Sequence, residues 1–276
     1  MIPLLAAVHP AFVLRSRRWY EVLRSDVRKA LRHADGRISW VAPQIILDPT
    51  PETLDSALDR LASGGKPIAV DTETNGLDPE RVDLRCGGLS DGAFGVAVGF
   101  RSAVAPHEEG RYVAAPGSPP RPTRCGLAAA RERLRNFFAL ARRPGGPAKI
   151  IVHNQVYDQP VLERHGMPLP DVAGVVDSIL LHKLADSELP HDLDFLASVL
   201  TDAPKWKVRD HDAWESDADL HRYCVLDCAV TARIAPGLAA EVRRSDQMQV
   251  YRGDQELQRL AIGLHRAGIC ADPAEQ

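Results

Sequence analysis

Two carboxylates stand close together at the end of an apolar stretch in the segment 68–79, which reads IAVDTETNGLDP. Asp71 and Glu73 are two residues apart, so on a β-strand both side chains point to the same face. Like charges at that spacing repel each other, and folding alone gives no reason to place them together. Carboxylate oxygens are ligands that hard divalent cations prefer. The pair therefore predicts a metal site.

Further polar side chains follow a second apolar stretch and lie in a later helical pattern. The run 150–152 predicts a buried strand, and Asn154 and Asp158 come directly after it. Polar residues at the ends of buried strands commonly mark the site of an open α/β sheet. Tyr223 and Asp227 are four residues apart and share one face of a helix. The neighbours of Asp227 are mostly apolar, so its charge would be costly unless a cation offsets it.

Each of these residues also has an ordinary structural explanation when it is considered alone. Asp71 can begin a loop, and Asn154 can cap the start of a helix. Asp158 can interact with the dipole of the helix that it enters. Tyr223 can be a packing residue. The ordered combination is much harder to explain in this way, so we interpret the set as one site.

The strands that must position this site are predicted from short apolar runs and turn residues. They lie at 67–70, 86–90, 94–100 and 150–152. Residues 101–125 are rich in Pro, Gly and Arg and predict an irregular loop, with a strand fragment at 112–114. Strands that alternate with helices predict an α/β domain with a mixed sheet.

The helices are predicted from apolar periodicity and end signals. They lie at 19–33, 127–142, 176–184, 193–200, 216–235 and 246–266. Thr50 is the expected N-cap of another helix, which begins at Pro51 and ends at Gly64. Pro160 is tolerated only near a helix start, so one helix should begin at about residues 156–159. Pro236 is expected to kink or end the long helix that contains Asp227.

The order DxE, NxxxD and YxxxD resembles the DEDD superfamily of 3′–5′ exonucleases, and the tyrosine is typical of its DEDDy branch. Two neighbouring segments, DSILL at 177–181 and LPHDLDFLA at 189–197, are similar to connecting helices of the proofreading domain in family A DNA polymerases. The resemblance covers about residues 66–240. It implies an RNase H-like fold, with a mixed sheet flanked by helices.

The resemblance also implies a metal centre and a water-orienting group. Asp71, Glu73, Asp158 and Asp227 would be the ligands of two Mg²⁺ or Mn²⁺ ions, and Tyr223 would orient the attacking water. Two ions roughly 4 Å apart can activate a water and stabilise the leaving 3′ oxygen. They would also cancel carboxylate charge that would otherwise repel a phosphate.

Three further residues would contact the substrate if the resemblance holds. Thr72 would help through its backbone, Leu77 would wedge against the terminal base, and Asn154 would lie near the scissile nucleotide. The implied reaction is proofreading-type hydrolysis at the 3′ end of single-stranded or frayed DNA, which releases nucleoside monophosphates. The expected partners are single-stranded DNA 3′ ends and a separate DNA polymerase, with no membrane.

Three other functions are compatible with part of this pattern. An RNase D-like enzyme that trims RNA 3′ ends shares the same motifs, and a noncatalytic nucleic-acid-binding or docking module could keep the fold. A strand ending in DxExT is also similar to phosphatases with an aspartate nucleophile. Those phosphatases usually have DxDxT, whereas the third position here is Glu73, and the later motifs favour the exonuclease.

The two flanks of the domain at 45–240 differ from it. Basic residues outnumber acidic ones in the segment 1–44, where HPAFVLR at 9–15 resembles the last segment of the uracil-DNA glycosylase superfamily. The other glycosylase motifs are missing, so we expect no glycosylase activity, although this segment could contact phosphates nonspecifically. The segment 241–276 is predicted to be a helical connector, similar to the start of a polymerase domain whose catalytic parts are not in this sequence.

Composition sets the remaining expectations. The chain has 276 residues, 45% of them hydrophobic, and a net charge of −3, which gives no overall basic field. Five cysteines without a CxxC pair argue against a disulfide framework and favour a reducing compartment. We expect no signal peptide and no membrane-spanning run, and a cytoplasmic setting of bacterial or phage type.

Overall fold

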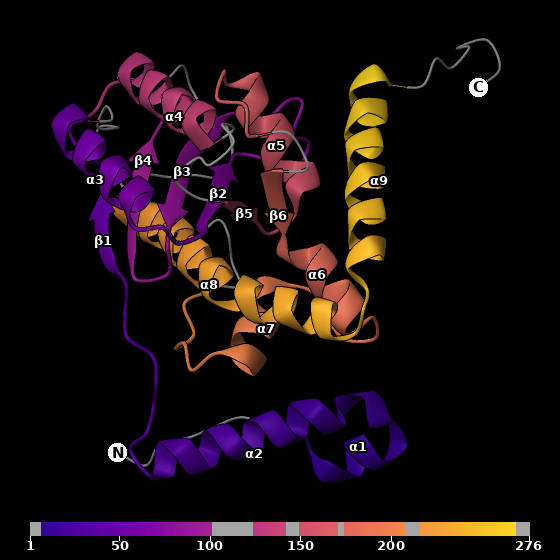
Figure 1. Cartoon of the computed structure of the whole chain (residues 1–276). Coiled ribbons are helices and arrows are strands. Elements are labelled where there is room, and N and C mark those ends of the chain that lie inside the picture. The colour runs from indigo at the N-terminus through magenta and orange to yellow at the C-terminus, as the bar shows by residue number, and fades with distance from the viewer. Residues whose placement is uncertain (1–6, 101–123, 142–148, 171–173, 208–215, 269–276) are drawn as a thin grey trace.

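A six-stranded mixed sheet, with helices on both faces, forms the centre of the computed structural model (Figure 1). The structure describes residues 7–100, 124–141, 149–170, 174–207 and 216–268. The strands are β1 (Gln44–Leu47), β2 (Ile68–Thr74), β3 (Leu84–Ser90), β4 (Phe94–Gly99), β5 (Ile150–Val152) and β6 (Val175–Asp177). Their order across the sheet is β1-β4-β3-β2-β5-β6. β3 is antiparallel to both of its neighbours, and the other pairs are parallel.

The predicted strands are confirmed, and two additional strands extend the sheet at its edges. β6 lies where a helix was predicted from residue 176, so that prediction is wrong at its start. The reason is length, because three strand residues run directly into the next helix and show no period of their own. β1 was not predicted either, and it pairs in parallel with β4. The loop predicted at 101–125 falls almost entirely outside the described residues, as does the strand fragment at 112–114.

The helices agree closely with the periodicity of the sequence. They are α1 (Pro10–Arg15), η1 (Arg17–Trp19), α2 (Tyr20–Ala34), α3 (Pro51–Ser63), α4 (Leu127–Ala141), α5 (Gln155–Arg164), α6 (Ser178–Ala185), α7 (Leu193–Leu200), α8 (Asp217–Arg244) and α9 (Met248–Ala267). The Thr50 side chain caps α3 as expected, by accepting from the backbone N–H of Thr53. Pro236 does not end α8, because buried side chains on both sides of it hold the helix in the core.

The two faces of β2 alternate between two hydrophobic layers. Ile68 and Val70 contact the core beneath α3, α4 and α5, whereas Ala69 contacts the face covered by α8. Successive strand residues point to opposite faces. Asp71 and Glu73 therefore follow Ala69 toward α8, and the intervening residue points toward α5.

Glycines in the central strands allow α8 to lie close against the sheet. A Cβ atom on Gly88 of β3 would be 2.9 Å from the sulfur atoms of both Cys224 and Cys228. A Cβ atom on Gly95 of β4 would be 2.6 Å from Val225. The contact between α8 and the sheet thus requires the absence of side chains at these two positions.

α8 is also long and apolar enough to cross a membrane by length and composition, contrary to the expectation of no such run. In the fold, 67% of its apolar window is buried inside the protein. The same apolar surface is therefore explained by its place in the core, between the sheet and the helices α6 and α7.

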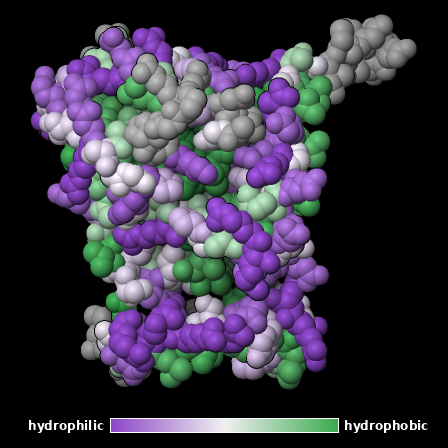
Figure 2. Space-filling model, in the orientation of Figure 1, coloured by the Kyte–Doolittle hydropathy of each residue, from purple (hydrophilic) through white to green (hydrophobic). Residues whose placement is uncertain are grey.

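The N-terminal helix α2 lies apart from the sheet and packs against α7 (Figure 1). Several of its contacts with that region are polar. Arg32 forms an ion pair of 2.7 Å with Asp202, and the Ser25 hydroxyl donates to the Val199 carbonyl at 2.8 Å. Hydrophilic residues dominate the surface over this helix (Figure 2). α9 packs at the other end of the sheet, against α5 and α6.

We predict that Gly88→Ala destabilises the fold by about 1–3 kcal/mol, because the added methyl group must push α8 away from the sheet. Urea unfolding followed by circular dichroism measures the change. Gly237→Ala is the matched control, because Gly237 lies in α8 itself and a Cβ atom there has no neighbour within 4 Å. That control should gain up to about 1 kcal/mol. Equal stability of Gly88→Ala and the wild type would contradict the close approach.

Candidate functional site

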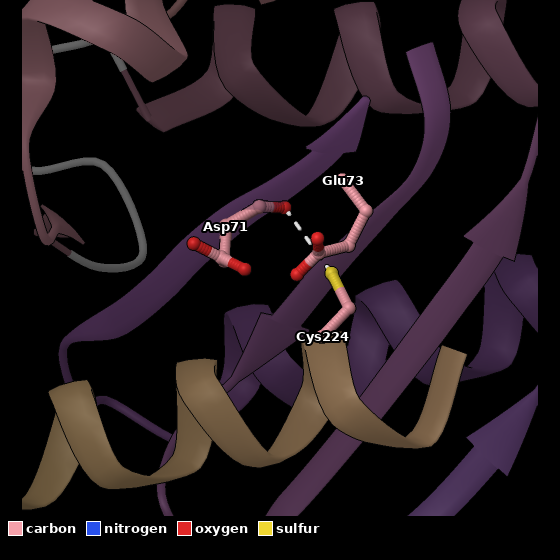
Figure 3. A group of neighbouring side chains, drawn as sticks. All are labelled: Asp71, Glu73 and Cys224. Atoms are coloured by element: carbon pink, nitrogen blue, oxygen red, sulfur yellow. Dashed lines mark hydrogen bonds between the residues drawn. The ribbon is translucent and has the colours of Figure 1, made fainter. Parts of the chain in front are cut away.

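A compact group of three potential metal ligands lies between β2 and α8. Asp71, Glu73 and Cys224 each offer one ligand atom, and these three atoms lie within 4.8 Å of one another. Figure 3 shows both carboxylates on the strand and the Cys224 sulfur facing them from the helix. The Cys224 sulfhydryl donates to the backbone carbonyl of Asp71 at 3.5 Å. Cys224 is not among the residues predicted for the site, although its place next to Tyr223 could have indicated it.

Asp158 approaches the site from the other side of β2. It lies in the first turn of α5 and is buried, and it accepts a hydrogen bond of 2.6 Å from the Thr72 hydroxyl. Thr72 thus contacts Asp158 through its side chain as well as through its backbone. Burial raises the pKa of Asp158 to about 8, and the hydrogen bond from Thr72 opposes that shift. Asp158 is not a member of the compact group of three.

Asp227 and Tyr223 lie on α8 and share one basic partner. The Lys207 ammonium donates to the Tyr223 hydroxyl at 2.9 Å and also contacts one Asp227 oxygen. The indole N–H of Trp206 donates to the other Asp227 oxygen at 2.6 Å. Burial raises the pKa of Asp227, and Lys207 opposes that rise. Asp227, like Asp158, is outside the compact group of three.

Trp206 and Lys207 were missed because the sequence analysis attributed the charge balance of Asp227 to metal ions alone. Its requirement was correct, since a buried carboxylate in an apolar helix face needs a positive neighbour. In the structure that neighbour is an ammonium group. The useful signal was a lysine and an aromatic residue just ahead of the YxxxD helix.

Asn154 occupies the N-cap position of α5, but its side chain makes no capping hydrogen bond. Its backbone is left-handed, with φ of 96°. Strained backbones of this kind concentrate at functional sites. The capping group is the fully buried Asp177, which accepts from the backbone N–H groups of Asn154 and Gln155 at 3.3 and 2.8 Å. Asp177 also caps α6 by accepting from Ile179 at 2.8 Å.

Leu77 lies in the turn that follows β2, and 90% of it is exposed. The turn is held by Tyr157 of α5, whose hydroxyl donates to the Gly76 carbonyl at 2.7 Å. A large apolar side chain on a fixed turn is available to contact a ligand. Leu77 thus lies beside the strand that carries Asp71 and Glu73, and its contact with a base stays a prediction.

The electrostatics of the site favour a bound cation. Burial raises the pKa values of Asp71 and Glu73 well above their ordinary range, and neighbouring acidic groups raise them further. Each carboxylate is thus harder to ionise because others lie close by. Oxygen-rich sites of this kind fit hard divalent ions, and Cys224 adds one softer ligand atom. Asp71 and Glu73 are best placed to hold the ion, with Asp158 and Asp227 beside them.

Neither a protein-family model nor a curated protein sequence matches this chain. Several solved structures are similar. NrnC of Brucella melitensis with bound Mg²⁺ has a TM-score of 0.53 and 19% identity, over 83% of this chain and 95% of NrnC. RNase D of Escherichia coli has a TM-score of 0.53 and 16% identity, over 80% of this chain and 51% of RNase D.

A polymerase structure is similar to the same extent. The POL domain of Pol1 from M. smegmatis, in complex with DNA primer-template and dNTP, has a TM-score of 0.59 and 16% identity, over 82% of this chain and 33% of that chain. These similarities confirm the predicted RNase H-like fold, with its mixed sheet flanked by helices. The resemblance of the N-terminal segment to uracil-DNA glycosylases stays a prediction, as do the boundaries at 44 and 240.

We predict that Asp158→Asn flattens the pH dependence of stability in metal-free buffer. The folded-state pKa of Asp158 is about 8, against an ordinary value of 3.8. Between these values the folded chain holds a proton that the unfolded chain releases, so stability falls as pH rises. Asparagine removes this contribution and keeps an acceptor for Thr72. Melting temperatures from about pH 5 to pH 8 measure the slope.

The control is Asp59→Asn, which changes an exposed residue on α3. It should leave the slope of melting temperature against pH unchanged. If Asp158→Asn and the wild type lose stability equally over this range, Asp158 does not carry the raised pKa.

Proposed function

We propose that this protein is a metal-dependent 3′–5′ exonuclease that hydrolyses phosphodiester bonds and releases nucleoside monophosphates. The observation that carries the proposal is the meeting of the β2 carboxylates with α8, inside a fold shared with DEDD-type exonucleases. Asp71 and Glu73 face Cys224 there, and Asp158 lies on the other side of the same strand, bonded to Thr72.

The residues of this chain have distinct roles in the proposed reaction. Asp71, Glu73, Asp158 and Asp227 would hold two Mg²⁺ or Mn²⁺ ions, which supply water activation and stabilisation of the leaving oxygen. The Tyr223 hydroxyl, which accepts a hydrogen bond from Lys207 in the metal-free protein, would orient the attacking water. A strong base is not required of Tyr223, and burial raises its pKa and keeps it protonated.

The substrate contacts follow from the placement of three other residues. Leu77 is exposed on its turn and would pack against the terminal base. The Asn154 side chain does not cap α5, which leaves it available to contact the scissile nucleotide. Thr72 fixes Asp158 through the 2.6 Å hydrogen bond.

Within this function we propose DNA as the substrate, in a proofreading or repair role on single-stranded or frayed 3′ ends. A separate DNA polymerase is the proposed partner, in a cytoplasmic setting of bacterial or phage type. The similarity to the polymerase Pol1 supports this choice. RNA trimming is the alternative, supported by the similarity to RNase D, an exoribonuclease involved in structured RNA processing.

Substitutions at the site should separate the metal ligands from the positioning groups. Asp71→Ala should lower the rate by about three or more orders of magnitude, equivalent to about 4 kcal/mol. Tyr223→Phe loses one hydroxyl and should lower the rate roughly ten- to a hundredfold. Release of labelled mononucleotides from a 3′-labelled oligonucleotide, with Mg²⁺ or Mn²⁺ and an EDTA control, measures both effects.

Asp194→Ala, a change in α7, is the matched control and should retain full activity. Absence of mononucleotide release with any divalent ion would overturn the enzyme proposal and favour a noncatalytic nucleic-acid-binding module. Near wild-type activity of Asp71→Ala would instead show that the site is assigned wrongly.

We predict that single-stranded DNA is shortened faster than RNA of the same sequence. The two oligonucleotides, with different fluorophores at their 5′ ends, compete in one reaction, and a gel resolves their products. A ratio of kcat/KM values above one is the expected result. Faster shortening of the RNA would replace the DNA assignment with RNA trimming and leave the proposed chemistry intact.

A further inference from the structure

Lys207 places a positive charge where the proposed reaction needs a metal ion. Its ammonium group contacts one oxygen of Asp227 and donates to the Tyr223 hydroxyl at 2.9 Å. The second oxygen of Asp227 accepts from Trp206 at 2.6 Å. The Lys207 side chain is 20% exposed and the Asp227 side chain 7% exposed. The pair is therefore mostly shielded from solvent.

The segment that carries this lysine is held by contacts at two places. The Trp206 ring packs against a hydrophobic cluster that includes residues of α6, α7 and α8. Upstream, the carboxylate of Asp202 pairs with Arg32 and accepts from the Ser39 hydroxyl at 2.8 Å. Lys29 of α2 donates to the Thr201 carbonyl at 2.9 Å. These contacts hold the segment 201–206, so the backbone position from which Lys207 reaches Asp227 is fixed by the fold.

A lysine ammonium is a compact charge with three donors and no acceptor. It can neutralise a carboxylate and donate a hydrogen bond to a hydroxyl group. Unlike a metal ion, it cannot coordinate a water molecule and activate it. A divalent ion bound by Asp227 requires the same carboxylate oxygens. The ammonium group already contacts one of these oxygens and would repel an approaching divalent ion. The ammonium group and an ion therefore compete for Asp227.

We propose that Lys207 is a positioning residue that stands in for the divalent ion at Asp227 and must be displaced when that ion binds. The proposal rests on the exonuclease function above, because it concerns the ion that this function assigns to Asp227. In the metal-free protein, Lys207 keeps Asp227 and Tyr223 in place and compensates the carboxylate charge. Metal binding at Asp227 is weaker as a result, because the ion must first compete with the ammonium.

Isothermal titration of Mn²⁺ into the metal-free full chain tests the proposal without measuring nuclease activity. Lys207→Met removes the competitor, so Mn²⁺ should bind roughly tenfold or more tightly, which is the size of about one unit in log Kd. The melting temperature without metal should fall, because Asp227 loses its partner. Lys205→Met is the matched control: it removes the same charge from an exposed position two residues away and should change neither quantity.

Lys207→Gln serves if the methionine variant does not fold, because glutamine keeps a hydrogen-bond donor and removes the charge. In an Asp227→Asn background, the removal of Lys207 should change the Mn²⁺ affinity by less than about twofold. Unchanged or weaker Mn²⁺ binding in a folded Lys207 variant overturns the proposal. Tighter Mn²⁺ binding supports it even if the wild type releases no nucleotides, so the two proposals fail separately.

Discussion

The close contact between α8 and the central strands is the constraint on which the candidate site depends. It needs bare glycines on the sheet, since Gly88 and Gly95 leave no room for a Cβ atom beneath the helix. The contact fixes the distance between α8 and β2. At that distance Cys224 on the helix faces Asp71 and Glu73 on the strand. The two glycines therefore determine both the packing of α8 and the geometry of the candidate site.

Charge compensation is the second requirement, and the protein meets it unevenly. Around Asp71 and Glu73 burial and crowding raise the pKa values, so a bound cation would favour the ionised form of these carboxyl groups. Around Asp227 the compensation is internal, through Lys207 and Trp206. Asp158 is stabilised by a neutral hydroxyl donor instead. Four carboxylates with similar sequence signals thus have three different electrostatic environments.

The sequence was sufficient for the central strands, most helices and the polar residues around the site, because these depend on local periodicity and on residue type. Thr50 and Pro51 mark a helix start whatever the rest of the chain does. The short strand β6 was missed because its pairing with β5 is a tertiary contact. The same reason explains Asp177, whose capping of two helices requires α5 and α6 to begin side by side.

Lys207 was missed for a related reason, since a lysine beside an aromatic residue does not by itself show that its partner lies twenty positions further on. Pro236 illustrates the opposite error, in which a strong local signal is overridden by burial on both sides of α8. Local rules are reliable where the chain interacts with itself nearby, and they fail where a distant element decides.

The polar seam between α2 and the segment 199–202 has a consequence for how the N-terminal region stays attached. Arg32, Lys29 and Ser25 bind α7 and the residues after it through charges and carbonyl groups. The contacts of the charged Arg32 and Lys29 weaken as dissolved ions screen them, whereas neutral contacts do so far less. Ionic strength thus acts on this seam selectively. The same segment leads to Trp206, which donates to Asp227 in the interior. A change in ionic strength at the surface seam is therefore expected to affect how Trp206 is held beside Asp227.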